Sequence, residues 1–211
     1  MSSSSKSKTT VIGLVGGVAA GKSHVARIFE QRGGVIIDAD ELGHTVLSRP
    51  LNARRIGQIF GTQVLDSDGQ VSRQRLGQLV FGDDVESQQR LALLEEVVHP
   101  QIHAEAVKQL RKLREQTNPP SVIVIDAPLL LEADWAPMCD LILYIDAPAH
   151  VRQQRATQRG WSEQHFQHRE ANQLSLEEKR KQATHFIDGS ADDADLAAAI
   201  DRILAELSSH G

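Results

Sequence analysis

The stretch Gly16-Gly17-Val18-Ala19-Ala20-Gly21-Lys22-Ser23 decides the fold of this chain. It matches the pattern G-x-x-x-x-G-K-[ST] at every fixed position. The apolar run Val11–Val15 precedes it, and Ser23–Arg32 follows with apolar residues at helical spacing. Glycines let the backbone turn so that successive N–H groups point inward, and the start of a helix adds partial positive charge. This strand, loop and helix therefore predict a binding site for the phosphates of a nucleoside triphosphate.

All eight residues of the stretch are candidate nucleotide-binding residues. Lys22 is predicted to reach the β- and γ-phosphates, and the Ser23 hydroxyl is predicted to bind Mg²⁺. We therefore expect ATP and Mg²⁺ as cofactors. The alternative is a glycine-rich turn with a chance Lys-Ser pair, and it does not explain the strand before the loop or the helix after it.

Short apolar runs separated by helical stretches recur along the chain and predict an α/β fold. Such runs form parallel sheets that are covered by helices on both faces. The expected strands are five: 11–15, 35–38, 121–126, 141–145 and 185–188. The predicted nucleotide-binding core comprises residues 11–51, 118–149 and 183–211. We expect helical insertions at 52–117 and 150–182, and a disordered, Ser-rich lead at 1–10.

Two acids of the sequence Asp-Ala-Asp, residues 38–40, are expected to end the second strand. Asp38 and Asp40 are spaced so that strand alternation would place them on one side of the chain, at the carboxyl edge where open α/β sheets bind ligands. A carboxylate there can orient or deprotonate a hydroxyl that attacks the γ-phosphate. We assign Asp40 as the catalytic base and Asp38 as its support. The alternative for one of them is a cap of the following helix.

A third acid, Asp126, ends the strand 121–126 after four apolar residues. This pattern is typical of an acid that holds Mg²⁺ directly or through water in P-loop proteins. Glu132 follows in the Leu-Leu-Leu-Glu segment and is a weaker candidate on the substrate side.

Three arginines, Arg152, Arg155 and Arg159, form a row at positions i, i+3 and i+7. At 100° per residue they lie within ~60° on one face of a helix. Such a row could close over triphosphate oxygens and stabilise charge in the transition state. We take Arg155 and Arg159 as catalytic candidates. The alternative is a solvated face that pairs with glutamates of the same segment.

Composition restricts the class of protein. The 211 residues carry a net charge of −5, which does not indicate a nucleic-acid binder. Cys139 is the only cysteine, so no intrachain disulfide can form. No apolar run approaches the ~18 residues that a membrane span needs. We expect a cytoplasmic monomer or weak homo-oligomer that acts on a small molecule, without nucleic-acid or membrane partners.

Beyond the phosphate motif, several blocks along Val11 to about Gly189 resemble the dephospho-CoA kinase family. The blocks are Ile37–Asp40, Phe60-Gly61, Asp68-Gly69 with Arg73 and Leu76, Val80-Phe81, Leu94-Glu95 to Ile102, Asp126–Glu132, and Arg155, Arg159, Gln173 and Lys179.

The resemblance implies a three-layer P-loop kinase fold, similar to nucleoside monophosphate kinases, with a helical CoA-binding domain and a mobile lid. It implies transfer of the ATP γ-phosphate to the ribose 3′-hydroxyl of dephospho-CoA, the last step of coenzyme A synthesis. The family's proposed base is the second aspartate of Asp-Ala-Asp, which is Asp40 here. Family motifs also place Arg73, His99, Pro128 and Glu132 on the substrate side.

The chain departs from the family pattern at four places. Val18-Ala19-Ala20 stands where Ile-Gly-Ser is usual, and His24 replaces a usual Thr. Thr184 stands where Ala-Asp is expected after the lid, and Asp188-Gly189 replaces Asn-Gly. The last two departures concern the adenine side of the site.

Two alternative functions remain open from the sequence. Another small-metabolite or nucleotide kinase of the same superfamily would use the same phosphate motifs, and only the central segment with His99-Pro100 favours dephospho-CoA. A non-catalytic ATP sensor would need neither the Asp38/Asp40 pair nor the arginine row. A GTPase switch is not indicated, because D-x-x-G at Asp66–Gly69 lies in a polar turn and no Asn-Lys-x-Asp motif follows a strand.

Overall fold

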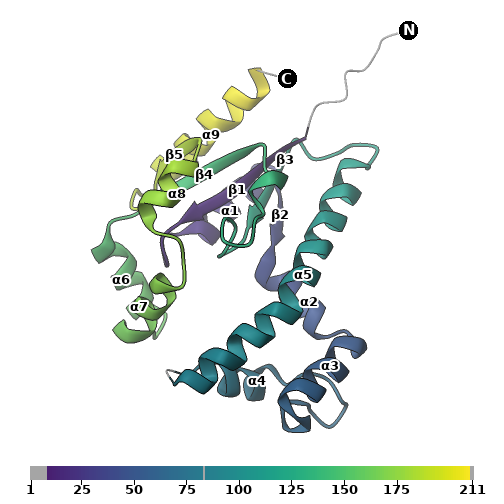
Figure 1. Ribbon diagram of the computed structural model, residues 1–211. Coiled ribbons are helices and arrows are strands. Elements are labelled where there is room, and N and C mark those ends of the chain that lie inside the picture. Colours follow the sequence, from purple (N-terminus) through teal and green to yellow (C-terminus); the bar gives the residue numbers. More distant parts are fainter. Residues whose placement is uncertain (1–8, 83, 210–211) are drawn as a thin grey trace. The chain divides into compact units, whose positions relative to one another are not determined.

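The computed structural model describes residues 9–82 and 84–209 (Figure 1). They form two compact units. One, the α/β unit, comprises the chain up to Asp38 together with Gln109 onward, and the other, the helical unit, is Ala39–Lys108. The helical unit thus begins and ends earlier in the chain than the insertion expected at 52–117. The first eight residues of the expected lead lie outside the described residues.

The α/β unit contains five parallel strands, as predicted. They are β1 (Thr10–Gly16), β2 (Val35–Asp38), β3 (Val122–Asp126), β4 (Leu141–Asp146) and β5 (His185–Asp188). Their order in the sheet is β2-β3-β1-β4-β5, and each neighbouring pair is parallel. The first strand begins one residue before the expected Val11, within the predicted lead, and the hydroxyl of Thr9 donates to the Pro120 carbonyl at 2.8 Å.

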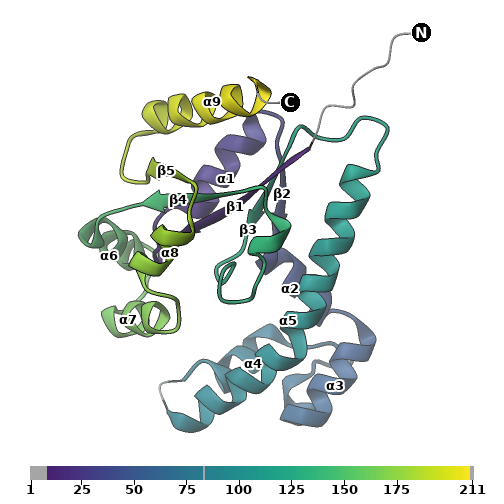
Figure 2. The same cartoon turned by 45° about the horizontal axis from the view of Figure 1, so that its top comes forward.

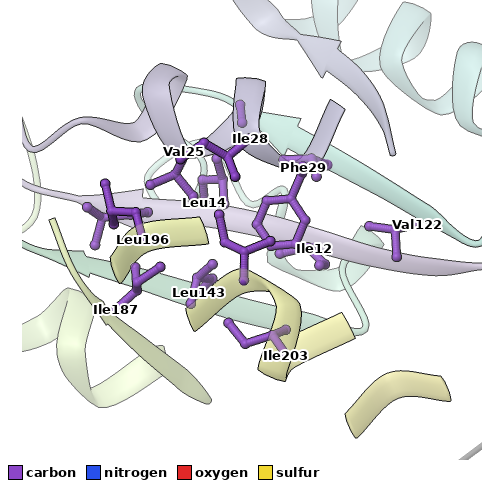
Figure 3. Close-up of a cluster of buried hydrophobic side chains, with 14 of the residues drawn as sticks. Ile12, Leu14, Val25, Ile28, Phe29, Val122, Leu143, Ile187, Leu196 and Ile203 are labelled. Carbon is purple, nitrogen blue, oxygen red and sulfur yellow. The ribbon is translucent and has the colours of Figure 1, made fainter. Parts of the chain in front are cut away.

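Two helices cover one face of this sheet. They are α1 (Lys22–Gln31) and α9 (Asp193–Ser209). Figure 3 shows Ile12 and Leu14 of β1 among Phe29 of α1 and Ile203 of α9, all of them buried. Because side chains alternate along a strand, the same face carries every second residue of β1, β3 and β4. This apolar layer fixes α1, and with it the loop that joins β1 to α1.

The opposite face of the sheet carries α8 (Leu176–Gln182). The Arg180 guanidinium of α8 lies over the ring of Tyr144 at 5.4 Å, and Tyr144 alternates with the core residues Leu143 and Ile145. A short 3-10 turn, η2 (Ala136–Met138), precedes β4 in the chain. The helices α6 (Ala149–Gln158) and α7 (Glu163–Ala171) precede α8 (Figure 2). The segment expected as a lid, 150–182, is therefore three helices.

The helical unit contains α2 (Ala39–Leu47), α3 (Pro50–Phe60), η1 (Thr62–Val64), α4 (Arg73–Val80) and most of α5 (Val85–Arg114). It has an apolar core of its own, which includes Val46, Ile56, Leu76 and Val98. Asp66 forms the predicted turn, since its Oδ1 accepts from the backbone N–H of Asp68 and of Gln70 at 3.0 and 2.9 Å. The turn interpretation of Asp66–Gly69 is confirmed.

The helix α5 contains Pro100, a residue that usually ends or kinks a helix. The helix α5 runs through Pro100 without a break. A proline inside a helix removes one backbone hydrogen bond and costs about 3 kcal/mol. The buried residues Leu94, Val97 and Val98 of α5 pack into the core of the helical unit on the preceding turns, and this burial offsets the cost.

No helix in the described part of the chain is both long and apolar enough to cross a membrane.

Candidate active site

The P-loop, residues 16–23, comprises the end of β1, the connecting loop and the start of α1, and unusual backbone angles hold it in shape. Gly21 has φ +108° and caps α1, a conformation that side-chain-bearing residues rarely adopt. A Cβ on Gly16 would lie 2.6 Å from the Ile145 carbonyl oxygen, so only glycine fits where the loop leaves the sheet. Ala19 also has a positive φ, +59°, a conformation that favours glycine. Gly16 is therefore required by its close approach to β4, and Gly21 by its positive φ. The backbone at Ala19 is strained, because an alanine adopts this conformation only at a cost in free energy.

Lys22 begins α1 and turns back over this loop. Its Nζ donates to the carbonyl oxygens of Gly16 and Gly17 at 3.4 and 3.2 Å. Burial, together with the positive charge of Lys179, lowers the pKa of Lys22 to about 8, while Asp126 and Glu132 act in the opposite direction. The ammonium group of Lys22 is therefore the centre of a cluster of charged side chains.

Two of the predicted acids meet at the carboxyl edge of the sheet. Asp38 of β2 and Asp126 of β3 are paired in register, and Leu14 of β1 is the next partner of Asp126. Register partners point to the same face, and Leu14 faces α1. Asp126 is therefore on the side of the sheet where α1 begins, and it is 7% exposed.

Asp40 does not end a strand, which corrects the alternation argument. The strand β2 ends at Asp38, and Asp40 is in the first turn of α2. Ala39 and Glu41 favour a helix, and acids in a first turn are stabilised by the positive end of the helix dipole. Asp38 and Asp40 therefore belong to different elements and to different units of the chain.

The first arginine of the row, Arg152, is buried and is bonded within the chain. It is 4% exposed, its Nε donates to the Ala147 carbonyl at 3.1 Å, and it forms an ion pair with Glu170 of α7. The same guanidinium lies 3.5 Å from the carbonyl oxygen of Val18 in the phosphate-binding loop. Arg152 thus joins α6 to α7 and to the loop.

Arg155 contacts the backbone of the same loop. Its two terminal nitrogens donate to the carbonyl oxygens of Ala20 and Gly189 at 2.9 and 2.8 Å. Gly189 directly follows β5, so one guanidinium connects the phosphate-binding loop to the turn between β5 and α9. The sequence does not reveal these contacts, because their acceptors are backbone atoms.

Arg159 differs from the other two arginines. It directly follows α6, is exposed, and stacks on the Trp161 ring with 5.8 Å between the guanidinium carbon and the ring centroid. Within the described part of the chain its guanidinium makes no hydrogen bond, and its charge acts on Lys22. Of the row, Arg159 is the arginine available to a ligand.

A buried ion pair joins Lys179 of α8 to Glu132, six residues after the end of β3. The Lys179 Nζ lies 3.2 Å from Glu132 Oε1 and donates to Gln173 Oε1 at 2.7 Å. Lys179 is 2% exposed. Lys179 is one of the lid positions that resemble the family pattern, but no local sequence pattern predicts that its partner is Glu132.

The other substrate-side candidates lie apart in the chain and in different units. Arg73 is the first residue of α4 and is exposed, and His99 is a half-buried residue of α5. Both belong to the helical unit, whereas Pro128 is exposed just after β3 in the α/β unit. Their placement on the substrate side stays a prediction.

Comparison with known proteins identifies the family. The dephospho-CoA kinase family model matches residues 10–195. The chain belongs to the dephospho-CoA kinase family. The dephospho-CoA kinase of Thermobifida fusca is 34% identical over 93% of this chain and 95% of its own length. The Thermus thermophilus protein TT1252 has a structure that matches with a TM-score of 0.74 at 32% identity, over 94% of this chain and 98% of that one.

The dephospho-CoA kinase of Campylobacter jejuni shows the same fold, with a TM-score of 0.65 at 24% identity over 94% of this chain and 97% of that one. The resemblance, the P-loop kinase fold and the assignment as an ATP-dependent phosphotransferase are therefore confirmed. Membership of the dephospho-CoA kinase family argues against the alternatives of another metabolite kinase and of a non-catalytic ATP sensor.

Proposed function

We propose that this chain transfers the γ-phosphoryl group of ATP to the ribose 3′-hydroxyl of dephospho-CoA, with the residue roles given below. The observation that carries the proposal is that the family match, residues 10–195, spans the P-loop and the whole helical unit. A match to the P-loop alone would indicate only the superfamily. The helical unit is then the CoA-binding domain, and α6 to α8 form the lid.

The backbone N–H groups of residues 16–23 bind the triphosphate, and Lys22 binds its β- and γ-phosphates. Lys22 donates to the carbonyls of Gly16 and Gly17 in this structure, and it must exchange them for phosphate oxygens. Exchange is favourable because phosphate oxygens carry full negative charge and carbonyl oxygens do not.

Ser23 and Asp126 are the groups that would hold Mg²⁺. A hydroxyl and a carboxylate are hard oxygen donors, and Mg²⁺ combines one or two such side chains with substrate phosphates and water. The described residues contain no group of three or more His, Cys, Asp or Glu that could hold a metal alone, which fits a site completed by ATP. An Mg²⁺ ion held by these residues would supply positive charge that stabilises the transferred phosphoryl group.

Asp40 is the proposed base that orients the attacking hydroxyl and accepts its proton, and Asp38 supports it. The support for Asp40 is its place at the start of α2, two residues after the strand end where Asp38 pairs with Asp126. Arg73, His99, Pro128 and Glu132 are proposed to contribute to the dephospho-CoA side.

Arg159 is the proposed transition-state arginine. Arg152 and Arg155 already donate to carbonyls of the P-loop and its neighbours, whereas the guanidinium of Arg159 is exposed and acts on Lys22. Positive charge at this place stabilises the equatorial oxygens of the transferred phosphoryl group.

The test is ADP release by the purified chain with Mg²⁺ATP and a panel of acceptors: dephospho-CoA, adenosine, AMP and shikimate. We expect dephospho-CoA alone to raise ADP release above the rate without acceptor, and Lys22→Ala to remove that increase. An equal increase with AMP or shikimate would contradict the proposed substrate. Release that no acceptor stimulates would indicate an ATPase.

A further inference from the structure

The side chain of Arg152 packs directly on the first turn of the P-loop. A Cβ on Gly17 would lie 2.8 Å from the Nη1 of Arg152 and 3.0 Å from both its Cδ and its Cζ. The same Nη1 lies 3.5 Å from the Val18 carbonyl oxygen, a long hydrogen bond that contributes little by itself. Steric contact with Gly17 is therefore the main way in which Arg152 acts on the loop.

Gly17 begins a turn in the part of the P-loop that binds phosphate through its backbone. The Gly17 carbonyl oxygen accepts the N–H of Ala20 at 3.2 Å, which closes a turn over residues 17–20. The same oxygen accepts from the Nζ of Lys22 at 3.2 Å. A turn closed by one backbone hydrogen bond is only weakly held. The direction of its N–H groups therefore depends on what packs against it.

Three groups outside the loop hold the Arg152 guanidinium in place. Its Nε donates to the Ala147 carbonyl at 3.1 Å, and its Nη1 forms the ion pair with Glu170 of α7. Its central carbon lies 5.7 Å from the centroid of the Phe166 ring, within the range of a cation–π contact. Arg152 is 4% exposed, so its side chain cannot turn toward water without losing these contacts.

The helices that hold the guanidinium also bury the apolar residues of the turn. Val18 and Ala19 form a buried cluster with Ala156 of α6 and Phe166 of α7. These residues all belong to the α/β unit. The P-loop therefore rests on α6 and α7 through apolar packing as well as through a buried guanidinium.

We propose that Arg152 is a positioning residue, which holds the turn Gly17–Ala20 in the conformation that binds the triphosphate, while Glu170 holds the guanidinium against the turn. Arg152 acts through the backbone of the loop and does not touch the phosphates. The inference rests on the proposed role of residues 16–23 in phosphate binding. It makes the packing of α6 and α7 on the P-loop a determinant of the affinity for ATP.

The test is a double-mutant cycle between Gly17→Ala and Arg152→Ala, in which titration calorimetry measures the Kd of MgATP for the full chain. Gly17 does not have a positive φ, so its backbone can carry an alanine, and the added Cβ must push the guanidinium away. Arg152→Ala removes the guanidinium directly. Each variant should raise the Kd at least about tenfold, because the turn then adopts the binding conformation in only a fraction of the molecules.

The double variant shows whether the two residues act through one contact. Both substitutions break the same contact, so the double variant should bind MgATP within about threefold of the weaker single variant. Independent effects would multiply to about a hundredfold rise in the Kd, and that result would overturn the proposal. A Kd within about threefold of the natural chain in either single variant would overturn it too. The control Gln153→Ala, exposed on the same helix, should leave the Kd unchanged.

Hydrogen exchange separates positioning from a direct contact with phosphate. In the chain without nucleotide, exchange of the Ala20 N–H measures how often the turn opens. Arg152→Ala should speed this exchange at least about tenfold and leave the N–H groups of β1 and β4 at their natural rates. A direct contact with phosphate predicts no change at Ala20, and a general loss of stability predicts faster exchange in the strands as well. Either result would overturn the proposal.

Two further measurements keep the outcomes distinct. Circular dichroism checks folding, and if Arg152→Ala does not fold, Arg152→Val, whose side chain is also too short to reach Gly17, replaces it in the cycle. Lys22→Met tests the underlying function: if it binds MgATP as tightly as the natural chain, phosphate binding by residues 16–23 is wrong. If Lys22→Met loses binding and Arg152→Ala does not, only the role of Arg152 is wrong.

Discussion

The P-loop and the row of Arg152, Arg155 and Arg159 were both predicted from sequence spacing, but they are formed by different kinds of interaction. The P-loop is formed by backbone conformation, with Gly16 pressed against the Ile145 carbonyl and Gly21 at φ +108°. The row is formed by side chains, and each of its three members has different partners. Arg152 and Arg155 donate to backbone carbonyls, and only Arg159 is exposed.

The difference shows that a regular spacing predicts which residues share a helix face but not what they bind. A motif that depends on backbone angles leaves its mark in glycines, and these are visible in sequence. Contacts of an arginine with a distant carbonyl leave no such mark. The row therefore divides into two arginines that contact the P-loop and one, Arg159, that is exposed and that we propose acts on the transferred phosphoryl group.

Lys22→Ala should have the largest effect, because it removes the only side chain of the P-loop predicted to bind the transferred phosphoryl. We expect no measurable transfer to dephospho-CoA in a coupled ADP assay, with a loss of at least about 10³-fold. Thermal unfolding checks that the fold is kept. Retained transfer would break the account of the P-loop.

Arg159→Ala and Arg155→Ala sharpen the division of the row. Arg159→Ala should lower kcat by about 10³-fold with little change in the melting temperature, since it removes transition-state charge. Arg155→Ala loses two hydrogen bonds and should lower the free energy of unfolding by about 2 kcal/mol. It should also weaken ATP binding. Stability curves and kcat for both variants test the division, and the reverse pattern would contradict it.

Asp40→Asn tests a group that belongs to neither region. The change keeps the size of the side chain and removes its ability to accept a proton, so kcat should fall by about 10²-fold. The Kd of MgATP, measured by titration calorimetry, should remain that of the natural chain. Normal turnover would exclude Asp40 as the base.

Ala19→Gly should have the smallest effect, and it should raise the free energy of unfolding, whereas Arg155→Ala should lower it. Ala19 has φ +59°, and a left-handed conformation costs a residue with a side chain about 1–2 kcal/mol. Glycine removes this strain, but it also increases the conformational entropy of the unfolded chain, which offsets part of the gain. We therefore expect the free energy of unfolding, measured in urea, to rise by up to about 1 kcal/mol. The control Ala20→Gly lies in the same loop, does not have a positive φ, and should destabilise.

Much of the fold could be predicted from the sequence because strands, glycines and apolar spacing are local signals. Val35–Asp38 and His185–Asp188 were predicted to the residue. The start of α2 was missed because Asp40 was read as part of an alternating strand. A single residue such as Ala39 does not distinguish a strand end from a helix start, and the tertiary packing that decides is not local.

Parts of the site that depend on a loop motif or on strand ends were predictable, and side-chain contacts between distant segments were not. Lys22 and Ser23 follow from one loop, and Asp38 and Asp126 follow from parallel strand ends. The pair of Glu132 and Lys179 joins two segments far apart in the chain. Helix α5 passing through Pro100 depends on burial that no window of sequence reveals.

The most direct test of the central claim is the structure of the reaction product. The natural chain is incubated with Mg²⁺ATP and dephospho-CoA, and the product is analysed by mass spectrometry and by ³¹P–¹H correlation NMR. We expect a gain of about 80 Da on dephospho-CoA, with the new phosphorus coupled to the ribose 3′ proton. No gain, or coupling to a different ribose proton, would contradict the proposed reaction.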